Sequence, residues 1–137
     1  MKILFLYVLL IPLFSNAQNF GDTKITVTLT DSAELYKKVK IVLVNFDFIV
    51  KDNYNYDTLT TYSKEFSNLN GQCRIMAIIK NNTVTFSGIY GLKKIDDWGY
   101  TQSPKDLQNI IYYRGSKSWA LLKAIAEKLG ERLTFSN

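Results

Sequence analysis

The chain has 137 residues, 47% of them apolar, and 17 basic against 12 acidic side chains give it a formal net charge of +5. This length and composition predict one globular domain and exclude a fibrous or disordered chain. With no His and a single Cys, the sequence excludes His-containing metal sites, nucleophile pairs that need His, a thiolate zinc site and an internal disulfide.

The first residues, MKILFLYVLLIPLFSNA, have the pattern of a secretory signal peptide. Lys2 precedes an apolar run at 3–14, and 15–17 forms a small-x-small cleavage site. We therefore expect export to the periplasm or the medium, cleavage near Ala17, and one α+β domain at 18–137. The apolar run is short for a membrane span and no stop-transfer segment follows, so we expect no span in the mature chain. A retained N-terminal anchor is the alternative.

The first elements of the mature chain are predicted as a strand and a helix. Residues 24–30, KITVTLT, alternate between apolar and polar side chains, as a half-buried strand does. Asp31 followed by Glu34 is typical of a capping box, and apolar residues then recur at helical spacing, which predicts a helix at 32–45. The β-branched residues of 39–46 leave a strand there as the alternative. Residues 48–53 and 58–66 are predicted as strands.

The clearest feature is a β-hairpin at 73–90, with Asn81 and Asn82 as its two-residue turn. Asn tolerates the positive φ that such turns require. Counting outward from the turn predicts a core face, which consists of the pairs Ile79–Val84, Ala77–Phe86, Ile75–Gly88 and Cys73–Tyr90. The opposite face is mixed and carries Arg74, Met76, Ile78, Thr85, Ser87 and Ile89. Cys73 is therefore expected to be a buried apolar residue and not a reactive thiol.

The last third of the chain begins with an irregular loop at 91–104 and a short strand within 107–114, centred on 110–113. A helix is predicted at 117–129, with Ser116 as its N-cap and Gly130 as a left-handed residue after its end. Residues 132–136 are predicted as a closing strand. This order, with the loop between the fifth strand and the second helix, predicts an α+β fold in which two helices cover one face of an antiparallel sheet.

Five segments carry a resemblance to known proteins: DSAELYKKV, FIVKD, DTLTTYSKEF, CRIMAIIKNNTVTFSGIYG and SWALLKAIAEKLGERLTF. Together they resemble small exported bacterial proteins of unknown function with a TATA-binding-protein-like or helix-grip sheet. Similar sheets occur in accessory lipoproteins of outer-membrane assembly machinery, although this chain lacks the lipid-anchor Cys. The resemblance implies a fold and a compartment, and it supplies no catalytic residues.

The functional prediction is an exported, non-catalytic binding or assembly module of the cell envelope. We expect it to use the open sheet face, with Met76, Ile78 and Ile89, to contact a second copy or an envelope protein. The alternative is a small-molecule or glycan binder that uses the 95–100 loop, with Asp97, Trp98 and Tyr100. A hydrolase using Asp96 or Asp97 is a third hypothesis. The scattered basic residues predict no nucleic-acid partner, and we expect no metal or cofactor.

Overall fold

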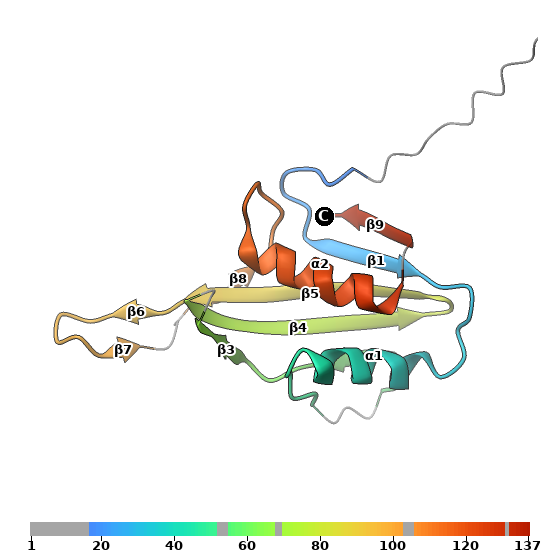
Figure 1. The fold of residues 1–137 in the computed structure, drawn as a ribbon, viewed down its shortest axis with the longest axis horizontal. Coiled ribbons are helices and arrows are strands. Elements are labelled where there is room, and N and C mark those ends of the chain that lie inside the picture. Colours follow the sequence, from blue (N-terminus) through green and yellow to red (C-terminus); the bar gives the residue numbers. More distant parts are fainter. Residues whose placement is uncertain (1–16, 52–54, 68–69, 103–105, 131) are drawn as a thin grey trace, which may run out of the picture.

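Two helices lie on the same face of an antiparallel sheet (Figure 1), which confirms the predicted α+β class. The computed structural model describes residues 17–51, 55–67, 70–102, 106–130 and 132–137. Their elements, in chain order, are β1 (Lys24–Thr28), α1 (Leu35–Asn45), β2 (Thr58–Thr60), β3 (Lys64–Phe66), β4 (Gly71–Lys80), β5 (Thr83–Leu92), β6 (Lys94–Ile95), β7 (Thr101–Gln102), β8 (Gln108–Asn109), α2 (Lys117–Leu129) and β9 (Arg132–Ser136). The main sheet has the order β2-β4-β5-β1-β9, with β3 also beside β4 and β8 also beside β5.

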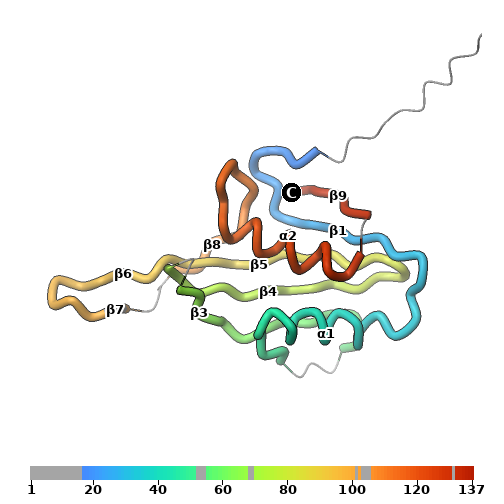
Figure 2. The backbone as a smooth tube through the Cα atoms, viewed as in Figure 1, coloured from blue at the N-terminus to red at the C-terminus, as the bar shows by residue number. Residues whose placement is uncertain are grey.

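The β4–β5 hairpin forms the centre of the sheet, and its predicted register is confirmed. Lys80 pairs with Thr83, and the pairing continues without a slip to Gly71 and Leu92. The turn residue Asn81 has a φ of 55°, which Asn tolerates. The tube view of Figure 2 shows the two long strands side by side at the centre of the sheet. The hairpin therefore determines which side chains of β4 and β5 face the helices.

The hydrophobic core lies between this sheet and the two helices. Each central strand contributes alternate side chains to it, as a half-covered sheet requires. The fully buried strand residues include Ile25, Val27, Ile75, Ala77, Val84 and Phe86, and those of α2 include Leu122, Ile125 and Ala126. Cys73 is also completely buried, as predicted. The opposite face of the sheet carries no helix within the described residues, so it remains open.

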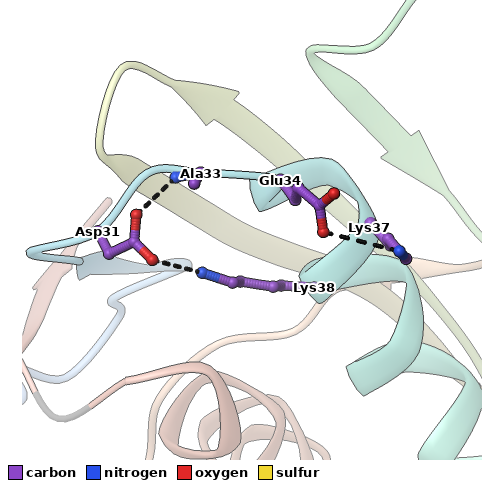
Figure 3. A network of polar contacts seen from close by, with 5 residues as sticks. All are labelled: Asp31, Ala33, Glu34, Lys37 and Lys38. Atoms are coloured by element: carbon purple, nitrogen blue, oxygen red, sulfur yellow. Dashed lines mark hydrogen bonds and ion pairs between the residues drawn. The ribbon is translucent and has the colours of Figure 1, made fainter.

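Helix α1 begins at Leu35, and the predicted capping box is wrong. Figure 3 shows the contacts that replace it: the Asp31 carboxylate accepts a hydrogen bond from the Ala33 N–H at 2.9 Å and another from Lys38 Nζ at 3.1 Å. Glu34 has a left-handed backbone, with φ 52°, and its carboxylate lies 3.6 Å from Lys37 Nζ. The left-handed residue interrupts the helix, so 32–34 lie outside it. For residues 39–46 the sequence left a strand as the alternative, and the structure shows them as helix as far as Asn45.

The predicted strand at 58–66 is interrupted at Thr61. Its side chain is buried, and its Oγ1 accepts a hydrogen bond from the Ile75 N–H at 3.0 Å. The hydroxyl thus takes the place of a backbone carbonyl, and the pairing with β4 splits into β2 and β3. The strand predicted at 48–53 is also wrong, because in its described part Val50 forms only an isolated bridge with Thr61; 52 and 53 lie outside the described residues.

The region from 91 onward is more regular than predicted. Leu92 ends β5, and the expected loop contains the small β6–β7 hairpin. The short strand predicted within 107–114 is present as β8, but it lies just before the predicted centre at 110–113. Ile110, at that centre, packs into the core. Helix α2 and its Ser116 cap are confirmed, because the serine Oγ accepts from the Trp119 N–H at 3.2 Å. The predicted left-handed Gly130 is wrong: its φ is −174°, an extended backbone.

Candidate functional site

The open face of the sheet, defined as the surface opposite the helices, brings three predicted site residues together. Met76 and Ile78 on β4 are 38% and 43% exposed, and Ile89 on β5 is half-buried. Their cross-strand partners are Ser87, Thr85 and Arg74. Met76 and Ile78 are two residues apart on one strand, so both side chains face the same side and contact water. Together they form a partly apolar surface, of the kind found at protein contacts.

A groove of about 410 Å³ crosses the open face where five strands meet. Its volume is within the range of about 300–1,000 Å³ that is usual for ligand sites. The side chains that line it include Lys24, Thr60, Arg74, Met76, Ser87 and Ile89. Strands β1, β2, β4 and β5 supply these residues, and β8 also lines the groove. The predicted Met76 and Ile89 are thus part of the groove wall, whereas Ile78 lies two residue pairs beyond Met76 toward the turn.

Arg74 and Lys24 are the two charged residues in the lining of this groove, and the sequence did not single out Arg74 as a site residue. Within the part of the chain that the structure describes, its Nη2 donates a hydrogen bond to the Ser63 Oγ at 3.3 Å. Its Nε–H is buried without an acceptor in the described part of the chain. A buried donor without a partner costs about 1–3 kcal/mol. Within the described residues the guanidinium has no carboxylate partner, so its positive charge is available to an anionic group that enters the groove.

The open face is positive. Along each strand, side chains that face the core alternate with side chains that face outward. Outward positions of this kind place four basic residues on the open face: Lys24, Arg74, Lys80 and Arg132. The described strand residues add one carboxylate to this face, Glu65. Its hydrogen bonds from Lys93 and Gln72 hold the pKa of that carboxyl below its usual range. Because Glu65 already has its own cation, the remaining positive charge favours an acidic partner.

The other predicted site residues lie on the β6–β7 hairpin, which projects beyond the ends of β4 and β5 in Figure 1. The Asp96 carboxylate holds its turn, since its Oδ1 accepts from the backbone N–H of Trp98 at 3.1 Å and of Tyr100 at 2.8 Å. Its Oδ2 accepts from Gln102 Nε2 at 3.2 Å. Asp96 is thus committed to the turn.

At the tip of this hairpin the side chains face the solvent. Trp98 is 86% exposed and Tyr100 is 72% exposed. Asp97 is exposed as well, and within the described residues its carboxylate has no hydrogen bond or ion pair. The structure therefore separates the predicted site residues into two groups: the apolar ones on the open face, and the aromatic and acidic ones on a projecting hairpin.

The Cys73 thiol and a second hollow are two further features of the molecule. Burial raises the pKa of the Cys73 thiol to about 12, so the thiolate is not available near neutral pH. A second hollow, of about 530 Å³, lies at the base of the β6–β7 hairpin, where Tyr90, Lys94 and Tyr113 contribute to its walls. Neither Asp97 nor Trp98 lines it.

Comparison with protein-family models gave no match, and comparison with curated proteins gave none either. The described residues contain no group of three or more Cys, Asp or Glu side chains placed to hold a metal ion. Within the same residues, neither helix has the length and apolar character needed to cross a membrane. The open face and the β6–β7 hairpin are therefore the two candidate functional surfaces of the described residues.

Proposed function

We propose that the protein is an exported, non-catalytic binding or assembly module that contacts another protein through its open sheet face. In this proposal the signal peptide is removed near Ala17, and the folded domain acts in the cell envelope. The observation that carries the proposal is the groove around Arg74, where a guanidinium with no carboxylate partner among the described residues lies beside the apolar walls of Met76 and Ile89. A central charged anchor with apolar side chains around it is typical of binding hot spots.

Two observations favour binding over catalysis. Two of the groups that a hydrolase or thiol enzyme could use are committed to structure: Asp96 holds a turn, and Cys73 lies in the core with a raised pKa. The groove itself is lined by an arginine, hydroxyl groups and apolar side chains. These groups are suited to recognising a carboxylate next to apolar surface.

The chain offers a well-matched pair of positions for a test. Ile78 on the open face is 43% exposed, and Ile41 on α1 is 51% exposed on the helix-covered side. A photo-crosslinking amino acid at each position, in cells that produce and export the protein, compares the two faces directly. We expect adducts to one identified protein, or to a second copy, from position 78 and none from position 41.

The adduct at position 78 should also disappear when Arg74 is replaced by Met, which keeps the length of the side chain but removes the charge. Circular dichroism would check that this variant retains its fold. Equal crosslinking from both faces, or an adduct at position 78 that survives Arg74→Met, would contradict the proposal.

Saccharide binding at the β6–β7 hairpin is a second candidate, favoured by the exposure of Trp98 and Tyr100. An aromatic face in water is free to stack on a sugar ring. The other tryptophan, Trp119, is buried, so an added ligand should change the fluorescence of Trp98 alone. We would expect a shift with cell-envelope saccharides that is absent in Trp98→Ala. No shift across such a panel would contradict this second function.

A further inference from the structure

We propose that the partner of the open face is a second copy of this chain, whose β6–β7 hairpin docks into the groove around Arg74. This inference rests on the proposed function, because it names the occupant of the same groove. In the docked pair, the Asp97 carboxylate of one copy meets the Arg74 guanidinium of the other. The Trp98 ring packs between Met76 and Ile89.

The hairpin has the properties of an anchor. Its turn is fixed by three hydrogen bonds to the Asp96 carboxylate, so little conformational entropy remains to be lost on docking. It presents Trp98 almost fully to water, together with Ile95 and Tyr100, each 72% exposed. Trp and Tyr are the residues most enriched at hot spots, and this much exposed aromatic surface on one hairpin marks an interaction site.

The groove is complementary to this hairpin in charge and in surface chemistry. Asp97 has no partner within the described residues, and Arg74 has no carboxylate partner there. A carboxylate accepts two N–H donors from one guanidinium in a side-on pair. The indole ring suits the other walls, because a thioether and a guanidinium both make favourable contacts with an aromatic face.

Asp97 also favours a second copy of the chain, and not a lipid surface, as the partner of the hairpin. Segments that lie in a membrane interface combine aromatic side chains with Lys or Arg, which anionic head groups attract. Here Asp97 is adjacent to the most exposed aromatic residue and would be repelled by such head groups. A positive groove has the opposite preference.

The contact joins two different surfaces of the chain. Two copies that exchange hairpins form an isologous pair, whereas head-to-tail contacts are heterologous and either close into a ring or continue as a chain of copies. All of these give a mass that rises with protein concentration. Sedimentation of the chain from Gln18 onward, which contains the helices and strands of the described residues, measures this directly.

Charge reversal provides the decisive experiment. We expect Asp97→Arg and Arg74→Asp each to weaken self-association at least tenfold, because each places like charges in contact. An equimolar mixture of the two variants should associate again, since every hairpin can then find a groove of opposite charge. Trp98→Ala should weaken association by a similar factor. Glu127→Arg, a matched reversal on the exposed side of α2, should have no effect.

A wild-type chain that stays monomeric at millimolar concentration would overturn the inference. So would association that Trp98→Ala and Asp97→Arg leave unchanged, or a mixture of the two reversed variants that fails to associate. These results can be distinguished from failure of the proposed function. A monomeric chain that still crosslinks from position 78 to a different protein would retain the contact surface and lose only its second copy.

Discussion

Ile110 occupies the space where Gly88 would carry a side chain. A Cβ atom added at Gly88 would lie 2.7 Å from the Ile110 Cδ1 and 2.9 Å from the backbone oxygen of Arg74. Gly88 faces the core opposite Ile75 in the β4–β5 register. The glycine therefore allows the segment after β8 to pack against the centre of the sheet.

Gly88→Ala should destabilise the protein by about 1–3 kcal/mol, as overpacking of a core does. Urea denaturation measures this loss. Ser87→Ala, on the open face one residue earlier, should change stability by less than about 0.5 kcal/mol. Ile110→Val should recover part of the loss in a Gly88→Ala background, and only part, because the contact with the Arg74 oxygen remains. Equal effects of the two alanine substitutions would show that Ile110 does not fill this space.

The sequence predicts features that depend on local alternation and fails where distant contacts decide. The β4–β5 register follows from period-two alternation and a two-residue Asn turn, both of which are local. The break at Thr61 depends on a hydrogen bond from Ile75, in another strand, which no local pattern reveals. Gly130 was expected to be left-handed because glycine is common there after a helix, yet its backbone is extended.

The candidate site shows the same division. Met76, Ile78 and Ile89 could be assigned to the open face, because the hairpin register alone places them there. The groove could not be predicted, since its walls come from five strands whose order along the sheet is not their order in the chain. One signal was available: Arg74 alternates with Met76 and Ile78 on the outward positions of β4. An arginine among outward apolar residues is a reasonable marker of a contact surface.

Packing against β1 explains why residue 130 is glycine. An added Cβ would lie 2.9 Å from the Val27 Cγ1, whereas the extended φ of −174° is accessible to any residue. Gly130→Ala should therefore cost about 1–3 kcal/mol through crowding. In a double-mutant cycle, Val27→Ala should reduce that cost. If a left-handed backbone were the reason for the glycine, the cost would be the same with or without Val27.

The left-handed backbone of Glu34 gives a prediction at the start of α1. A side chain at φ 52° is strained and glycine is not. Glu34→Gly should therefore be more stable than Glu34→Ala by about 1 kcal/mol, although both lose the ion pair with Lys37. Thermal unfolding of the two variants tests this. A capping box would give no such preference for glycine, so equal stability would restore that interpretation.

The pH dependence of Asp31 follows from its contacts at the same helix. The hydrogen bond from the Ala33 N–H, followed by the hydrogen bond and charge of Lys38, lowers the pKa of this carboxyl. A carboxyl whose pKa is lower in the folded state stabilises the fold above its unfolded pKa, and that stability is lost as the pH falls through the folded pKa. Asp31→Asn should thus lower the melting temperature at pH 7 and leave it unchanged at pH 2. The same loss at both pH values would exclude this charge as the cause.

The buried thiol of Cys73 should make the protein less stable in alkaline solution. Burial raises its pKa to about 12 in the folded state, whereas an unfolded thiol titrates near about 8.5. Below the unfolded pKa both states hold the proton, and above it only the folded state does. The free energy of unfolding should therefore fall as the pH rises from about 9, by at most about 1.4 kcal/mol per pH unit from this group. Cys73→Ala should have a shallower slope over the same range.

Native protein should also resist a disulfide-exchange reagent at pH 8 and react fully in guanidinium chloride, and rapid labelling of the native thiol would refute the buried position.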